Sequence, residues 1–136
     1  MKPNNRELGT CYYPEHWPED LWQTDAEQMI NLGLKWVRIG EFSWSRLEPK
    51  ENEFSFEWLD RAIETLGKVG LSIILGTPTA TPPTWVIKKY PDMLALDADG
   101  RQRGFGSRRH YCFSHEGYRN QCSKIVRKLA ERYGSN

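Results

Sequence analysis

The feature that most constrains the fold of this chain is a short apolar run at residues 71–76, which reads LSIILG. A strand that is apolar at nearly every position is typical of a parallel sheet buried on both faces. Parallel neighbours are joined by a crossover, which is usually a helix. Residues 56–69, just before the run, carry apolar side chains at helical spacing and end at Gly70, a helix stop. This pairing of helix and strand predicts an α/β fold.

The same alternation of strand and helix extends over the chain. A first strand at residues 8–13 and a second at 34–40 flank a helical pattern at 19–32. Four further features follow the third strand: a Thr- and Pro-rich loop at 77–83, a short helix at 84–89, a small hairpin around the turn at 97–100, and a last helix at 115–133. This order predicts parallel strands in either a doubly wound sheet or a (β/α)8 barrel.

The first strand-to-helix turn favours the barrel. It reads YYPEHW at residues 12–17, where a dinucleotide-binding sheet would carry a glycine-rich turn. The loops after the strands are long, polar and aromatic, and barrel enzymes place their chemistry in such loops. A barrel closes with eight strands, and the pattern predicts three. We therefore predict an incomplete barrel, the first three β/α units, over residues 1–136, with residues 1–7 as a lead-in.

Composition excludes several classes of partner. The chain has 19 basic and 18 acidic residues, a balance that gives no footprint for nucleic acid. It has no apolar window of about 18 residues and starts without an apolar run, so we expect neither a membrane helix nor a secretory signal. Its three cysteines, Cys11, Cys112 and Cys122, are widely spaced, which fits a reducing compartment. We therefore expect a cytoplasmic protein with no nucleic-acid or membrane partner.

Polar and aromatic side chains gather after the predicted strands, and parallel strands bring such loops to one end of a sheet. The candidates are Tyr12, Tyr13, Glu15, His16, Trp17, Arg38, Glu41, Phe42, Trp44, Arg46, Thr77, Thr79, Thr81, Trp85, Arg108, Arg109 and His110. Charged groups and an aromatic wall together suit a polyhydroxylated ligand. Structural explanations stay open: Arg38 and Glu41 as an ordinary ion pair, Trp17 as helix packing, and Cys11 and Cys122 as small core residues.

Four ordered motifs make the pattern specific. They are LGTCYYPEHW at residues 8–17, VRIGEFSWSRLEP at 37–49, TPTATPPTW at 77–85 and RRHYC at 108–112. Together they resemble the N-terminal barrel segment of the family 42 β-galactosidases, a family of glycoside hydrolases. The resemblance covers the chain from about Leu8 to Gly134.

The resemblance implies hydrolysis of terminal non-reducing β-D-galactose residues by a retaining mechanism that uses two carboxylates. In the family, the acid/base follows the fourth strand in an Asn-Glu pair, and the nucleophile follows the seventh. The pair Asn52-Glu53 lies before the second predicted helix, in the wrong place, so we reject it. We expect both catalytic carboxylates beyond the C-terminus, in a full-length parent protein, and an isolated chain that is inactive.

Binding residues carry over from the family. Arg38 and Glu41 match positions that contact galactose hydroxyls, and Arg108 matches a position that contacts substrate near the nucleophile. Cys112 matches the first of four cysteines that bind a structural zinc ion in many members. The chemistry itself needs no cofactor, and we expect the parent to be a homo-oligomer. Two alternatives stay open: a non-catalytic carbohydrate-binding protein, and a barrel glycosidase of different sugar specificity.

Overall fold

The computed structural model describes residues 6–106 and 109–135. The chain divides into two compact units. The first, the sheet unit, comprises Met1–Gly40 and Phe56–Gly76, and the second, the helical unit, comprises Glu41–Ser55 and Thr77–Asn136.

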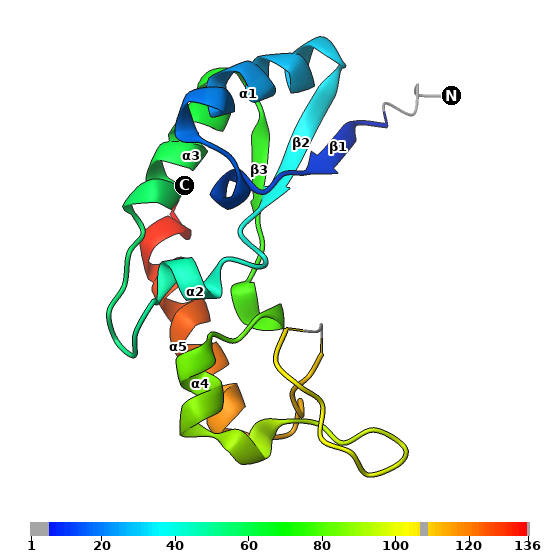
Figure 1. Ribbon diagram of the computed structural model, residues 1–136. Helices are drawn as coiled ribbons and strands as arrows, with labels where there is room; N and C mark the ends of the chain where they lie inside the picture. The colour runs from blue at the N-terminus through cyan, green and yellow to red at the C-terminus, as the bar shows by residue number, and fades with distance from the viewer. Residues whose placement is uncertain (1–5, 107–108, 136) are drawn as a thin grey trace. The chain divides into compact units, whose positions relative to one another are not determined.

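Three short strands make up the sheet of the sheet unit: β1 (Leu8–Cys11), β2 (Leu34–Ile39) and β3 (Ser72–Leu75). They are parallel and lie in the order β1-β2-β3 (Figure 1). Helix α1 (Trp22–Asn31) joins β1 to β2, and helix α3 (Glu57–Lys68) leads into β3. The predicted alternation of parallel strands and helices is therefore confirmed.

The two faces of this sheet differ in burial. Val37 and Ile39 of β2 are fully buried, as are Leu59 and Leu66 of α3, and the two helices contact β2 and β3. Burial of each such side chain contributes about 1.5–3 kcal/mol. Side chains alternate along a strand, so Trp36 lies on the other face, where it is 39% exposed. Helices thus stabilise one face, while the other presents apolar groups to solvent.

Glycine is required where β1 approaches β2. A Cβ atom added at Gly9 would lie 2.8 Å from both the Cβ atom and the carbonyl oxygen of Trp36. Real Cβ atoms do not approach other atoms this closely, so a side chain at this position would push the two strands apart. The pairing register also shifts between Leu8 and Gly9, at the start of the strand.

The segment before β2 differs from its prediction. The single helix predicted for residues 19–32 is a 3-10 turn, η2 (Glu19–Leu21), followed by α1, and another 3-10 turn, η1 (Pro14–His16), precedes them. Glu19 forms a bidentate ion pair with Arg61 of α3, at 2.6 and 2.9 Å. Leu21 and Leu32, predicted to face the core, lie just outside α1 and are exposed, so the apolar face of the segment 19–32 is narrower than predicted.

The described residues of the helical unit form three helices: α2 (Trp44–Leu47), α4 (Thr84–Lys89) and α5 (Glu116–Tyr133). Two 3-10 turns, η3 (Pro78–Ala80) and η4 (Pro91–Met93), flank α4. The core of this unit consists of fully or almost fully buried side chains: Trp44, Leu47, Val86, Met93, Ile125 and Leu129. Residues 84–89 form the predicted short helix, whereas α2 was not predicted. In the part of the chain that the structure describes, no helix has the length and apolar character needed to cross a membrane.

The predicted small hairpin is present in the helical unit. An antiparallel bridge joins Leu96 to Gln102. The Asp97 carboxylate closes the turn, because one of its oxygens accepts hydrogen bonds from the backbone N–H groups of Asp99 and Arg101, each at 2.9 Å. A separate antiparallel bridge joins Leu94 to Tyr111, which follows the hairpin in the chain. The Asp-x-Asp-Gly turn signal therefore forms the structure that its residue types favour.

Candidate functional site

Arg38 lies next to the last residue of β2, at the carboxyl end of the strand. Its backbone carbonyl accepts a hydrogen bond of 2.9 Å from the N–H of Tyr12. In the register of the sheet it pairs with Cys11 on one side and with Ile74 on the other. Paired residues of parallel strands share a face, so Arg38 lies on the sheet face without helices, together with the exposed Ile74. Cys11 is also exposed, which corrects its expected core position.

Glu41 begins the helical unit, two residues after β2 ends. The chain turns at Gly40, whose φ angle of 87° lies in the left-handed region that favours glycine. Glu41 is only 9% exposed. A carboxylate so far removed from water is costly unless hydrogen bonds compensate it. Glu41 is therefore a buried side chain in the turn between β2 and α2 and not a solvated loop side chain.

The remaining predicted site residues lie in or near the RRHYC motif. Arg108 lies outside the described residues. Its neighbour Arg109 has a φ angle of 59°, an uncommon conformation for a residue other than glycine. The thiol of Cys112 is free and exposed, and the N–H of Cys112 donates to the Met93 carbonyl at 2.7 Å. Of the three predicted binding residues, Arg38 thus belongs to the sheet unit and Glu41 to the helical unit, while Arg108 is not among the described residues.

The described residues do not by themselves form a metal site. Among residues 6–106 and 109–135, no three His, Cys, Asp or Glu side chains gather in a way that could hold a metal ion. A structural zinc ion needs four ligands, and Cys112 supplies one thiolate. Its assignment as a zinc ligand stays a prediction.

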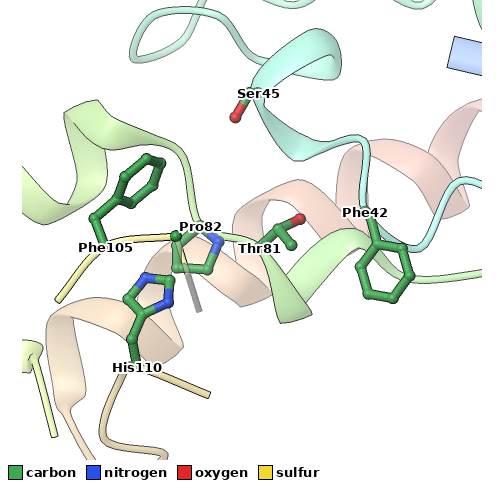
Figure 2. Close-up of a pocket in the computed structure, with 7 residues that line it drawn as sticks. Phe42, Ser45, Thr81, Pro82, Phe105 and His110 are labelled. Carbon is green, nitrogen blue, oxygen red and sulfur yellow. The ribbon is translucent and has the colours of Figure 1, made fainter. Parts of the chain in front are cut away.

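A pocket of about 280 Å³ opens in the helical unit. Its lining comprises Phe42, Ser45, Thr81, Pro82, Phe105, Gly106 and His110. Figure 2 shows Ser45 on α2 and Thr81 and Pro82 on the segment after η3, with Phe105 and His110 on the segment before α5. The rings of His110 and Phe105 meet edge to face, with ring centroids 5.8 Å apart and an interplanar angle of 75°. Apolar rings with a few hydroxyl groups suit a small ligand that has both an apolar and a polar face.

Sequence reasoning identified part of this lining. Phe42, Thr81 and His110 were candidates from the motifs. Ser45 and Phe105 were not predicted. Phe105 stands between two glycines, and this pattern could have indicated it as a candidate.

The residues after β1 have structural roles in the sheet unit. The Tyr12 hydroxyl donates a hydrogen bond of 2.7 Å to Asp25 in α1. Burial, followed by this bond to an anion, raises the pKa of Tyr12 well above its usual value. His16 stacks on Tyr13 with ring centroids 5.7 Å apart, and Trp17 is exposed. The Trp22 indole N–H donates to the Pro14 carbonyl at 3.1 Å.

Glu48 is the buried charge that sequence reasoning missed. Its side chain is 0% exposed, and it accepts hydrogen bonds from three donors in the helical unit. These are the indole N–H of Trp44 at 3.0 Å, the backbone N–H of Asn52 at 3.0 Å and the ammonium of Lys124 at 2.7 Å. The backbone carbonyl of Glu48 accepts a fourth bond, of 2.9 Å, from the indole of Trp85. One residue therefore links α2, the following turn, α4 and α5.

Comparison with known proteins identifies what the motifs belong to. The model of glycoside hydrolase family 42, described as Beta-galactosidase, matches residues 11–136. A β-galactosidase of Thermus thermophilus is 56% identical over 127 residues, which are 93% of this chain and 20% of that protein. The β-galactosidase Bga of Halorubrum lacusprofundi is 49% identical over 129 residues, 95% of this chain and 18% of that protein.

Solved structures agree. The crystal structure of a β-galactosidase from the psychrophilic Marinomonas ef1 matches with a TM-score of 0.92 and 54% identity, over 95% of this chain and 20% of that one. The structure from Halorubrum lacusprofundi matches with a TM-score of 0.91 and 48% identity, over 96% and 20%. These structures are barrels matched at their N-terminal portion. The chain thus spans about a fifth of the length of the proteins that it matches.

Proposed function

Because this chain belongs to glycoside hydrolase family 42, the β-galactosidases, we propose that the whole protein hydrolyses terminal non-reducing β-D-galactose residues of β-galactosides. The observation that carries the proposal is the family match over residues 11–136, together with 56% identity to a protein named as a β-galactosidase. The predicted membership of the family and the predicted barrel are confirmed. The reaction of the whole protein and the role of this segment are our proposal.

The reaction requires two carboxylates, about 5–5.5 Å apart when configuration is retained, of which one is nucleophile and the other acid/base. Glu53 is unsuited to either role, because it lies 61% exposed in a turn and pairs with Lys50 at 3.3 Å. Glu48 is fully buried behind Trp44 and Lys124. We therefore propose that this segment supplies binding groups, that both catalytic carboxylates lie elsewhere in the whole protein, and that the segment alone is inactive.

Arg38 and Glu41 are the binding groups that we propose from the described residues, with Arg108 as a third from the sequence. A guanidinium donates to sugar hydroxyls, and a carboxylate accepts from them, in charge-assisted hydrogen bonds that are stronger than neutral ones. The position of Arg38 at the carboxyl end of β2 supports this role, since barrel enzymes bind substrate at that end. The low exposure of Glu41 supports an ordered acceptor.

The alternation of strand and helix argues against the rival interpretation as a carbohydrate-binding module, since such modules are usually β-sandwiches. We further propose a cytoplasmic homo-oligomer that uses no cofactor in the chemistry, with Cys112 as one ligand of a structural zinc ion.

A segment exchange tests the proposal. Residues 11–136 replace the matching segment of the Thermus relative, and hydrolysis of a chromogenic β-galactoside is measured for the chimera and for the isolated chain. We expect an active chimera and an inactive chain. In the chimera, Glu41→Gln and Arg38→Met should each lower kcat/KM by roughly 10- to 150-fold, which corresponds to the free energy of a hydrogen bond to a charged group. Glu53→Gln, on the surface, is the matched control and should leave kcat/KM unchanged.

Two results would reject the proposal. One is a correctly folded chimera that hydrolyses no β-galactoside. The other is turnover by the isolated chain that survives purification and disappears on Glu41→Gln.

A further inference from the structure

We propose that Glu48 is a positioning residue, which holds the segment from Glu41 to α2 in place through its buried pair with Lys124. The inference rests on the proposed function, because it concerns how Glu41 is presented to a galactoside. It assigns to Glu48 and Lys124 a role that does not require either of them to touch the sugar.

The two oxygens of the Glu48 carboxylate accept hydrogen bonds from different donors. Oε2 accepts from the indole N–H of Trp44, the first residue of α2, at 3.0 Å. Oε1 accepts from the backbone N–H of Asn52 at 3.0 Å and from the ammonium of Lys124 at 2.7 Å. A glutamine has one acceptor oxygen and a donor NH2 group in their place, so it cannot satisfy all three donors.

The turn that follows α2 depends on this carboxylate. Asn52 adopts a φ angle of 65°, an uncommon left-handed conformation for which asparagine is the most tolerant residue after glycine. Its N–H is held by Glu48, and its side-chain oxygen accepts from Lys124 at 3.2 Å. The charged pair therefore fixes both ends of the segment between Trp44 and Asn52.

Helices α4 and α5 anchor the pair from outside the segment. Lys124 belongs to α5, and its ammonium lies 5.1 Å from the centre of the Trp85 ring of α4 and 6.0 Å from that of Phe54. The Trp85 indole N–H in turn donates to the Glu48 carbonyl at 2.9 Å. Side chains of two other helices thus hold Glu48, the residue that directly follows α2.

A buried ion pair is poor evidence for stability, because apolar residues of similar volume often stabilise a core equally well. The hydrogen bonds of Glu48 and Lys124 are directional, so the pair fixes the position of the segment from Trp44 to Asn52. α2 begins three residues after Glu41, and its first turn closes when the N–H groups of Arg46 and Leu47 donate to the Ser43 carbonyl at 2.9 Å. Phe42 and Ser45, on the same segment, line one side of the pocket of the helical unit (Figure 2). A shift of α2 would move Glu41 and that lining together.

The double variant Glu48→Gln/Lys124→Met in the chimera separates positioning from folding, because it removes both charges and leaves neither unpaired. We expect a melting temperature near that of the unaltered chimera, but a KM for the chromogenic galactoside and a Ki for free galactose that both rise about 10-fold or more, as small misplacements of binding groups produce. Lys124→Arg keeps the pair and should keep both constants. Unchanged KM and Ki in the double variant would overturn the proposal.

A second measurement stands even if the double variant loses stability or the chimera lacks activity. Amide hydrogen exchange in the chain itself should be at least 10-fold faster at Arg46 and Leu47 in the double variant, with exchange at Val37 of β2 unchanged, since local openings are independent of distant ones. Equal acceleration at all three amides, or none, would reject positioning by Glu48. An inactive unaltered chimera would reject only the proposed function.

Discussion

The ammonium of Lys124 lies 2.7 Å from the carboxylate of Glu48, and the two side chains are 25% and 0% exposed. The pair joins the middle of α5 to the residue after α2. Since the acid is buried more deeply than the base, the two halves of the pair differ in what their loss leaves behind. Loss of the lysine leaves a charge without access to water, whereas loss of the acid leaves an ammonium that can still reach solvent.

This asymmetry predicts unequal effects of mutation on stability. Lys124→Met leaves a buried carboxylate that has hydrogen bonds but no cation beside it, and should lower the free energy of unfolding by about 3–5 kcal/mol. Glu48→Gln should cost less, about 1–3 kcal/mol. The double variant should cost less than the sum of the two, since the charges are removed together. Urea denaturation of the four proteins measures all three quantities.

The same helix provides a control. Lys128 pairs with Glu131 at 3.1 Å, but these side chains are 46% and 55% exposed. Lys128→Met should therefore change the free energy of unfolding by less than about 1 kcal/mol. Strictly additive effects of the Glu48 and Lys124 variants would show that the two side chains are not energetically coupled.

The sheet could be predicted from sequence because its signals are local. The apolar run before Gly76 and the helical spacing before Gly70 each lie within one short window. Helix α2 was missed because its four residues are too few to show a period. The exposure of Leu21 and Leu32 was missed because spacing shows which side chains share a face, and not how much of that face is covered.

The site divides in the same way. Arg38 and Glu41 were found because they belong to a contiguous motif. The role of Glu48 within the same motif was not found, because its partner Lys124 lies in another helix, far along the chain, and only the fold brings the two together. A buried charged residue can be identified only when its partner is known, and no short stretch of the sequence contains both Glu48 and Lys124.

The close approach of β1 and β2 gives the second prediction. Gly9→Ala places a methyl group 2.8 Å from atoms of Trp36 and should lower the free energy of unfolding by about 1–3 kcal/mol through overpacking. Gly67→Ala in α3 is the control, because a Cβ atom there meets nothing within 4 Å. It should stabilise the chain by about 0.5–1 kcal/mol, since alanine favours a helix over glycine. An unchanged free energy of unfolding for Gly9→Ala would contradict the prediction. It would mean that β1 and β2 can move apart to accept the methyl group at no cost in stability.

The third prediction concerns alkaline pH. Burial is the main cause that raises the pKa of both Tyr12 and Tyr118, and hydrogen bonds add to it, including that from Tyr12 to Asp25. In the unfolded chain these hydroxyls ionise near pH 10, while in the folded chain they keep their protons. Folded protein then binds more protons than unfolded protein, so the contribution of these two tyrosines to stability is constant below about pH 10 and falls as the pH rises further.

Each tyrosine should add up to about 1.4 kcal/mol per pH unit to this fall. Tyr12→Phe and Tyr118→Phe should each flatten the decline between pH 10 and 12, although each also loses a hydrogen bond, that of Tyr118 being donated to the Thr79 carbonyl at 2.7 Å. The comparison is therefore made on slopes of the unfolding free energy against pH and not on its value at one pH. Parallel slopes for the unaltered chain and both variants would mean that these hydroxyls ionise equally in both states.

The last prediction concerns association of the chain. Among the described strands, β1 and β3 are the edges of the sheet, and the face without helices presents Trp36 and Ile74, which are 39% and 48% exposed. Edge strands offer rows of N–H and C=O groups to other chains, and β3 has no lysine or proline within it to discourage pairing. We therefore expect the isolated chain to self-associate, as sedimentation velocity over a range of concentrations would show.

Ile74→Lys should shift the chain toward monomer, because a charge at the middle of an edge strand opposes pairing. Leu96→Lys, which removes an exposed apolar side chain from the hairpin of the helical unit, should leave association unchanged. An unaltered chain that sediments as a monomer and unfolds in one sharp transition would show that the three strands and their helices are sufficient without a partner on the open face.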